Sequence, residues 1–346
     1  MGKKEDSMRR YGCALVSFVF LFCLLAAALP AHGQETKVIR LKYASFYPTA
    51  SSPHLLLEQW CKEVEKRTNG RVKISLFGGG TLAPIPQSYD VAPRGIADIS
   101  VTCPQWMTGR FPLTDVLYLP LGVKSDYQAT KMADAWFKKF KPKEYDDVKV
   151  LYFYSTALGA IMTLKPLPSI NDLKNVKVKV TGRTAPIISA LDAVPVSAVL
   201  SEIYESLMMG VAEGAILPTD ALKIYRLGEL VKGLQINPGM SYPSGMVVVM
   251  NKAKWNSLPP DIQKTIEAIS EEWVEKTANL QKDETKKAIE FGISKGMKVF
   301  EISPPEIETT KKKVKPILDD YVKRMKEKSL PGEASLNFCL EYIKSH

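Results

Sequence analysis

The chain has 346 residues, of which 45% are hydrophobic, 24% charged and 9% aromatic. This length fits about two domains of ordinary size. The composition is that of a chain that buries a core, which excludes intrinsic disorder and collagen-like repeats. The 47 basic residues exceed the 37 acidic ones, for a net charge of +10. Because the basic residues are scattered and no basic patch is interleaved with aromatics, the sequence does not favour a nucleic-acid partner.

The first 33 residues are predicted to be a signal peptide. Basic residues near the N-terminus precede an apolar stretch from Cys13 to Leu29, and Ala31-His32-Gly33 has the small residues typical of a cleavage site. Cleavage near Gly33 removes four basic and two acidic residues, lowers the net charge from +10 to +8 and gives a periplasmic protein. An uncleaved membrane anchor is the alternative, although this apolar stretch is short for a span of about 20 residues.

The cysteines and histidines of the mature chain do not form a recognisable metal or catalytic motif. Cys61, Cys103 and Cys339 are far apart and have no C-x-x-C spacing, and the histidines after the leader are His54 and His346. We therefore expect no metal site, no cofactor and no disulfide. Ser-His-Asp and Cys-His catalysis is excluded unless His54 takes part, so no catalytic residue is assigned and a non-enzymatic function is favoured.

The first part of the mature chain is predicted to alternate strands and helices. Strands are expected at 38–45, 72–77 and 96–102, with helices at 51–69 and 89–95. This β-α-β-α-β order implies a mostly parallel sheet covered by helices. Gly78-Gly79-Gly80 lacks the spacing of a phosphate-binding loop and is interpreted as a turn.

A second cycle of the same kind follows. Strands are expected at 148–154, 176–180, 194–199 and 214–217, with helices at 186–191 and 202–209. Met246–Met250 is entirely apolar and is predicted to be a strand inside a sheet. A helix is predicted from Pro259 to about Lys295, with apolar residues at spacings of three and four. At ~1.5 Å per residue it is roughly 50 Å long, so we expect it to cross from one lobe to the other.

Several ordered motifs carry a family resemblance that covers nearly all of the mature chain. The segments are 172–183 (DLKNVKVKVTGR), 190–196 (ALDAVPV), 202–207 (EIYESL) and 210–215 (GVAEGA). They are supported by 77–82 (FGGGTL) and 95–98 (GIAD). In this order the motifs resemble those of the DctP-type periplasmic solute-binding proteins of TRAP transporters.

The resemblance implies an α/β fold of the two-lobed periplasmic binding protein type, type II-like, with hinge strands and a long helix spanning both lobes. Lobe I is expected to comprise 34–155 plus 245–284, and lobe II 156–244 plus 285–346. It also implies a protein that captures a small organic acid in an interlobe cleft and delivers it to the membrane subunits of a TRAP permease. The alternatives are the binding component of another transporter or of a sensor and, less favoured, an extracytoplasmic enzyme on the same scaffold.

Two basic residues are candidates for the carboxylate anchor. The family motif carries an arginine that grips the ligand carboxylate, and the matching residue here is Lys179. Lysine is a point charge without the planar fork of arginine, so Arg183, four residues later, is the other candidate. Both assignments are open at this point.

The remaining candidate pocket residues are apolar or aromatic. Leu217 belongs to a strand end, Gly214–Leu217, that often carries Gln-Glu-Asn in relatives that bind sugar acids, and Gly159 stands where some members have another arginine. The aromatic candidates lie at or just after predicted strand ends, where open α/β sheets bind ligands; they are Phe46, Tyr47, Trp106, Tyr154 and Tyr242. Together these residues predict a hydrophobic or aromatic monocarboxylate as the ligand.

Overall fold

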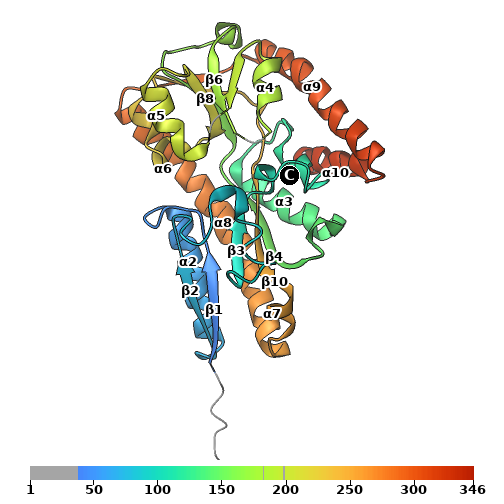
Figure 1. Ribbon diagram of the computed structural model, residues 1–346. Coiled ribbons are helices and arrows are strands. Elements are labelled where there is room, and N and C mark those ends of the chain that lie inside the picture. Colours follow the sequence, from blue (N-terminus) through green and yellow to red (C-terminus); the bar gives the residue numbers. More distant parts are fainter. Residues whose placement is uncertain (1–37, 182, 198) are drawn as a thin grey trace, which may run out of the picture. The chain divides into compact units, whose positions relative to one another are not determined.

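The computed structural model describes residues 38–181, 183–197 and 199–346. The predicted signal peptide and its cleavage site near Gly33 lie outside the described residues. Ile39–His346 forms one compact unit, and it contains two mixed β-sheets flanked by helices (Figure 1). This arrangement confirms the predicted α/β class.

The first sheet has five strands in the order β2-β1-β3-β10-β4. β10 lies between β3 and β4 and runs antiparallel to both, whereas β1 is parallel to β2 and β3. The apolar sequence of β10 fits this central position, because side chains on both of its faces are covered. The strand bounds are β1 Ile39–Ala44, β2 Val72–Phe77, β3 Ile99–Thr102, β4 Val148–Ser155 and β10 Gly245–Asn251.

The second sheet has six strands in the order β11-β9-β5-β8-β6-β7. β5 alone among them runs antiparallel to its neighbours β8 and β9. The strand bounds are β5 Gly159–Thr163, β6 Lys177–Val180, β7 Val194–Ser197, β8 Gly214–Pro218, β9 Gly233–Ile236 and β11 Lys298–Glu301. The shorter helices near this sheet are α4 Ala185–Ala190, α5 Ile203–Met208 and α6 Ala221–Ile224.

Two connecting segments join the sheets at corresponding edges. Residues 156–158 lead from the end of β4 into β5, and residues 237–244 lead from the end of β9 into β10. Because β5 and β10 are the reversed strands, both segments connect the edges at which the parallel strands of each sheet end. Ligands of open α/β sheets bind outside these carboxyl-terminal edges, so the topology directs attention to the residues that follow the strands.

The long helix α8, Pro260–Ser294, confirms the predicted helix within one residue at each end. It contacts α2 (Ser52–Arg67) and β4 beside the first sheet and α6 beside the second, as the orange ribbon in Figure 1 shows. Its first half contributes Ile262, Ile266 and Trp273 to the core around the first sheet, whereas Ala288 belongs to the core of the second. Within the part of the chain that the structure describes, none of the helices combines the length and apolar character of a membrane span.

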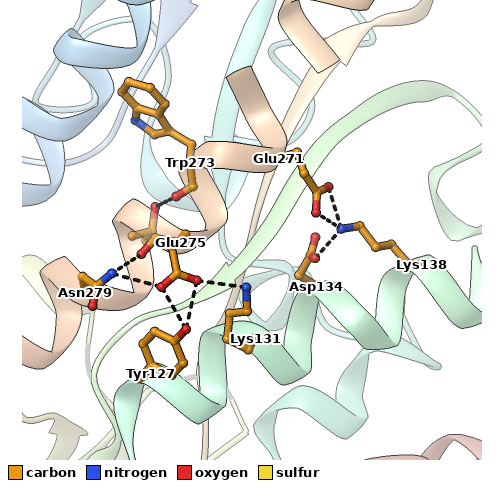
Figure 2. Close-up of polar contacts among 9 residues, drawn as sticks. Tyr127, Lys131, Asp134, Lys138, Glu271, Trp273, Glu275 and Asn279 are labelled. Carbon is orange, nitrogen blue, oxygen red and sulfur yellow. Dashed lines mark hydrogen bonds and ion pairs between the residues drawn. The ribbon is translucent and has the colours of Figure 1, made fainter. Parts of the chain in front are cut away.

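Polar contacts attach α8 to α3 (Asp126–Phe140) beside the first sheet (Figure 2). The hydroxyl of Tyr127 donates to Glu275 at 2.8 Å, and Nζ of Lys131 lies 3.0 Å from the same carboxylate. One turn along α8, Glu271 accepts from Lys138, which also pairs with Asp134 at 2.7 Å. These contacts tie the long helix to one side of the molecule.

The expected lobe boundaries stay a prediction, and the C-terminal helices are the part of the chain that fits them least. The strands of the first sheet all fall within 34–155 and 245–284, and those of the second within 156–244 and 285–346. However, α10 (Gly332–Ser345) packs against α3, and Tyr321 and Met325 of α9 (Pro304–Glu327) join the same core. We therefore place the last part of the chain with the first sheet.

The helix predicted at Tyr89–Gly95 is wrong. The segment is a series of turns after a short 3-10 helix, Ile85–Gln87. Pro93 explains the difference, because it has no backbone N–H and its ring disfavours a regular helix at that position. The prediction of a turn at Gly78–Gly80 is confirmed, since Gly79 and Gly80 adopt positive φ angles of 65° and 71°.

Candidate functional site

The structure gathers four of the predicted pocket residues around one hollow, which we call the aromatic hollow. Phe46, Tyr47, Trp106 and Leu217 line it. The other lining residues are Cys103, Gln105, Thr156, Thr181, Leu200, Pro218, Asp220, Ala221, Ile224, Tyr225, Ser244 and Met246. Its volume is about 60 Å³, which is space for about two water molecules at ~30 Å³ each.

The topology explains why these residues meet. Phe46 and Tyr47 follow β1, Gln105 and Trp106 follow β3, and Thr156 follows β4. Thr181 and Asp220 follow β6 and β8 of the second sheet, and Ser244 immediately precedes the reversed strand β10. The aromatic hollow is thus lined at the carboxyl-terminal edges of both sheets.

Aromatic rings form one wall of the hollow. The ring centroids of Phe46 and Tyr47 are 4.2 Å apart, and Trp106 meets Phe46 edge to face at 4.9 Å. Tyr154 does not line the hollow, but its hydroxyl lies 3.0 Å from that of Tyr47 and supports this ring from the core. Such rings provide apolar area in fixed positions.

Lys179 lies on β6, between β8 and the edge strand β7, with its side chain buried, and it does not itself line the aromatic hollow. It is 6% exposed, and its Nζ lies 3.4 Å from the backbone oxygen of Ser197. Among residues 38–181, 183–197 and 199–346, no carboxylate lies within 4.0 Å of this ammonium group. Side chains of register partners and of residues two apart on one strand share a face, so Lys179 faces the same side as Ala215 of β8 and as Leu217, which lines the aromatic hollow.

Arg183, the other candidate anchor, lies at a second hollow, which we call the arginine hollow. This hollow has a volume of about 620 Å³ and is lined by Arg183, Asp115, Arg324, Lys313 and Asp320, with apolar residues between them. Nε of Arg183 lies 2.7 Å from Oδ1 of Asp115 in an ion pair that lacks hydrogen-bond alignment. Arg183 does not line the aromatic hollow.

Tyr242, the last predicted pocket residue, packs into the core instead. It is 1% exposed and belongs to a cluster with Ile161 and Val314. A Cβ atom on residue 159 would lie 1.9 Å from Cε1 of its ring. Gly159, the position where some relatives have an arginine, therefore leaves room for the Tyr242 ring.

Three polar residues of the hollow, Gln105, Ser244 and Asp220, were not among the predicted site residues. Oε1 of Gln105 and Oγ of Ser244 are buried and have no hydrogen-bond partner in the described residues. Asp220 is 6% exposed, and burial, followed by the nearby charges of Asp126 and Glu284, raises the pKa of its carboxyl to about 7. All three residues lie within three positions of a strand, so the strand-end rule that found Phe46 could have found them.

The described residues contain no group of three or more His, Cys, Asp and Glu side chains that could hold a metal ion. Cys61, Cys103 and Cys339 are buried free thiols, and burial raises the pKa of the first two to about 12. His54 is also buried and packs against Gly78, away from the aromatic hollow. The geometry of the hollow is that of a binding site built from rings, one acid and two unsatisfied polar groups.

A third hollow, of about 1,020 Å³, lies beside α8. It is lined by Lys124, Lys282 and Lys286 among others, and it includes none of the eight predicted site residues. Its size alone does not make it the candidate site, because four of the eight predicted site residues gather at the aromatic hollow instead.

Solved structures and curated proteins share this fold. A TRAP periplasmic solute-binding protein from Desulfovibrio salexigens is 29% identical, with a TM-score of 0.81 over 89% of this chain and 96% of that chain. A TRAP solute-binding protein from Rhodoferax ferrireducens, solved with copurified benzoate, is 25% identical, with a TM-score of 0.82 over 89% of this chain and 98% of that one. A monocarboxylate 2-oxoacid-binding periplasmic protein from Nostoc is 27% identical over 65% of this chain and 64% of its own length.

The sequence profile of family 7 of the bacterial extracellular solute-binding proteins, the DctP family, matches residues 43–324. This match includes every candidate site residue and all strands of both sheets except the first four residues of β1. The chain therefore belongs to the DctP family of bacterial extracellular solute-binding proteins.

Proposed function

We propose that this TRAP-type solute-binding protein carries a monocarboxylate with an apolar or aromatic body, and that Lys179 pairs with the carboxylate. DctP-type proteins are periplasmic, bind small organic acids and work with a membrane permease. The proposal adds the class of acid, the anchor and delivery to a TRAP permease, together with cleavage of a signal peptide near Gly33.

The observation that carries the proposal is the buried, unpaired ammonium group of Lys179. An isolated charge in a protein interior is costly unless it is paired. Within the described residues its polar contact is one backbone oxygen at 3.4 Å. A ligand carboxylate supplies the missing partner, and its attraction to the ammonium group is strengthened where water is excluded.

The walls of the hollow favour the apolar body. Leu217 is 1% exposed and lies on β8, on the same face of the sheet as Lys179. Phe46 and Trp106 line the hollow from the first sheet. Burial of apolar area stabilises a complex by ~25 cal/mol per Å². The benzoate complex of the Rhodoferax relative and the monocarboxylate named for the Nostoc relative support the same class of ligand.

The present volume of the aromatic hollow requires that it widens when a ligand enters. About 60 Å³ is too small for a benzene ring with a carboxylate. The segments 156–158 and 237–244 join the two sheets beside this hollow and are the positions where a change in backbone angles can separate its walls. A ligand shifts the population toward the form that it binds more tightly, here a form wider than the one described.

The test uses the mature protein purified without denaturation. Mass spectrometry of the released small molecules should reveal an acid with one carboxylate. Calorimetry with benzoate, 3-phenylpropanoate, 4-methylpentanoate and glucuronate should show the aryl or branched acids binding at least about tenfold more tightly than the uronate, a difference of about 1.4 kcal/mol. Tight uronate binding without measurable binding of the other acids contradicts the proposal.

A further inference from the structure

The aromatic hollow is lined by a buried acid, Asp220, which a simple monocarboxylate leaves without a partner. Asp220 lies two residues after β8 and lines the hollow. Within the described residues no Lys, Arg or His nitrogen lies within 4.0 Å of its carboxylate. It stands at the N-terminal boundary of α6, but its side chain makes no capping hydrogen bond.

The groups that face Asp220 do not neutralise it. The charged ones are Asp126, at the start of α3, and Glu284 on α8, and both are acidic. Glu284 already pairs with Lys287 at 2.8 Å and with Lys223 at 3.6 Å. The other titratable neighbours are neutral tyrosines from four different segments: Tyr47, Tyr154, Tyr225 and Tyr242.

The unsatisfied atoms beside Asp220 point to a hydrogen-bond donor. Oε1 of Gln105 can only accept, and Oγ of Ser244 can do either; both are buried without a partner and both residues line the hollow. The rings of Phe46 and Trp106 line the same space. Aromatic faces attract cations, with the largest effect where water is excluded.

We propose that Asp220 binds a protonated amine, so that the ligand is a zwitterion with its carboxylate at Lys179 and its ammonium group at Asp220. This inference rests on the proposed function and narrows it. A zwitterion compensates both unpaired buried charges at once, whereas a hydroxyl group donates a hydrogen bond but leaves the charge of Asp220 uncompensated. Gln105 and Ser244 accept the remaining N–H bonds.

Matched pairs of ligands that differ by the amine test this proposal. The pairs are phenylalanine with 3-phenylpropanoate, where the amine is beside the acid, and 4-(aminomethyl)benzoate with 4-methylbenzoate, where it is distant. Calorimetry at pH 8 should show that the aminated member of one pair binds at least about tenfold more tightly. Both amines stay protonated from pH 6 to pH 8. The pKa of Asp220 is about 7, so this affinity should rise about tenfold over that range, while that of the amine-free acid should fall.

Variants separate the role of Asp220 from a general effect of charge. Asp220→Asn keeps the size of the side chain and should abolish the preference for the amine. Glu284→Gln removes a nearby acid that does not line the hollow and should preserve the preference. Thermal unfolding of each variant shows that it is folded.

Three outcomes overturn the inference. Equal binding within both pairs, or a preference that persists in folded Asp220→Asn, contradicts the amine site and leaves the proposed acid binding intact. Failure of every acid and zwitterion to bind contradicts the proposed function as well.

Discussion

The aromatic hollow and the arginine hollow differ in how their charges are paired. In the arginine hollow, Asp115 lies 2.7 Å from Arg183 and 3.6 Å from Arg324. Asp220 of the aromatic hollow has no cation within 4.0 Å in the described residues, and Lys179, on the adjoining strand β6, has no carboxylate within that distance. A buried ion that already has its partner stabilises a local arrangement, whereas one without a partner is ready to bind a ligand. This contrast is why we propose that the smaller hollow is the binding site.

The largest effect is expected from the two candidate anchors. Lys179→Met should weaken binding of the preferred acid at least about 100-fold, about 2.7 kcal/mol, because the ligand carboxylate would be buried without a cation. Arg183→Met should change the affinity by less than about threefold, since Arg183 already pairs with Asp115. Calorimetry on both variants measures the contrast. A larger loss in Arg183→Met than in Lys179→Met reverses the assignment of the two hollows.

The second prediction concerns the pH dependence of stability without ligand. Burial raises the pKa of Asp220 from 3.8 to about 7. The folded state therefore holds this proton over a pH range in which the unfolded state has lost it, and stability falls as pH rises from about 4 to 7. Between pH 5.5 and pH 8 the loss should be about 2 kcal/mol.

Asp220→Asn should remove most of this decline and should be more stable than the wild type at pH 8. Denaturant unfolding at pH 5.5, 7 and 8 measures both expectations. A decline of the same size in the variant would assign the pH dependence to other groups, among which Asp115 is the first to examine.

The third prediction addresses the paired side of the comparison. Arg183→Met leaves the buried Asp115 with Arg324 as its remaining partner. The free energy of unfolding should fall by about 1.5 kcal/mol at pH 8. This is less than the loss of a fully buried partner would cause, because a quarter of the Arg183 side chain is exposed. Burial raises the pKa of Asp115 to about 6. At pH 5 Asp115 is mostly protonated, so the deficit should shrink.

A double-mutant cycle isolates this pair. Asp115→Asn alone should change stability little, and the double variant should resemble Asp115→Asn. Additive losses would show that the two side chains do not interact in solution.

Local sequence patterns predicted much of the fold. β2 was predicted at its observed bounds, and the apolar run Met246–Met250 lies within β10, because periodicity and burial are local properties. The helix expected at Tyr89–Gly95 does not form, because the effect of Pro93 on the backbone outweighs the spacing of the apolar residues. The sheets proved mixed, since the pairing of β10 with β3 and β4 depends on segments that are distant in the chain.

The site was predicted only in part, for a related reason. The rule that residues just after a strand lie near the ligand identified Phe46 and Trp106. The same rule could not show that the side chain of Tyr242 packs into the core. The sequence also left Lys179 and Arg183 open, because the partner that distinguishes them, Asp115, belongs to a different segment. Asp220 was not predicted, because a single carboxylate in the sequence does not indicate a site until the groups around it in the fold are known.

The smallest effect is expected where charges are paired and exposed. Lys131→Met removes the contact of 3.0 Å with Glu275 between α3 and α8, and the side chains of these two residues are 36% and 45% exposed (Figure 2). Water and ions screen such pairs, so the free energy of unfolding should fall by about 0.5 kcal/mol or less. The hydroxyl of Tyr127 still donates to Glu275 in this variant. Denaturant unfolding at low and high salt measures this change. A loss of stability larger than that of Arg183→Met would contradict the expectation that buried charge pairs stabilise this protein more than exposed ones.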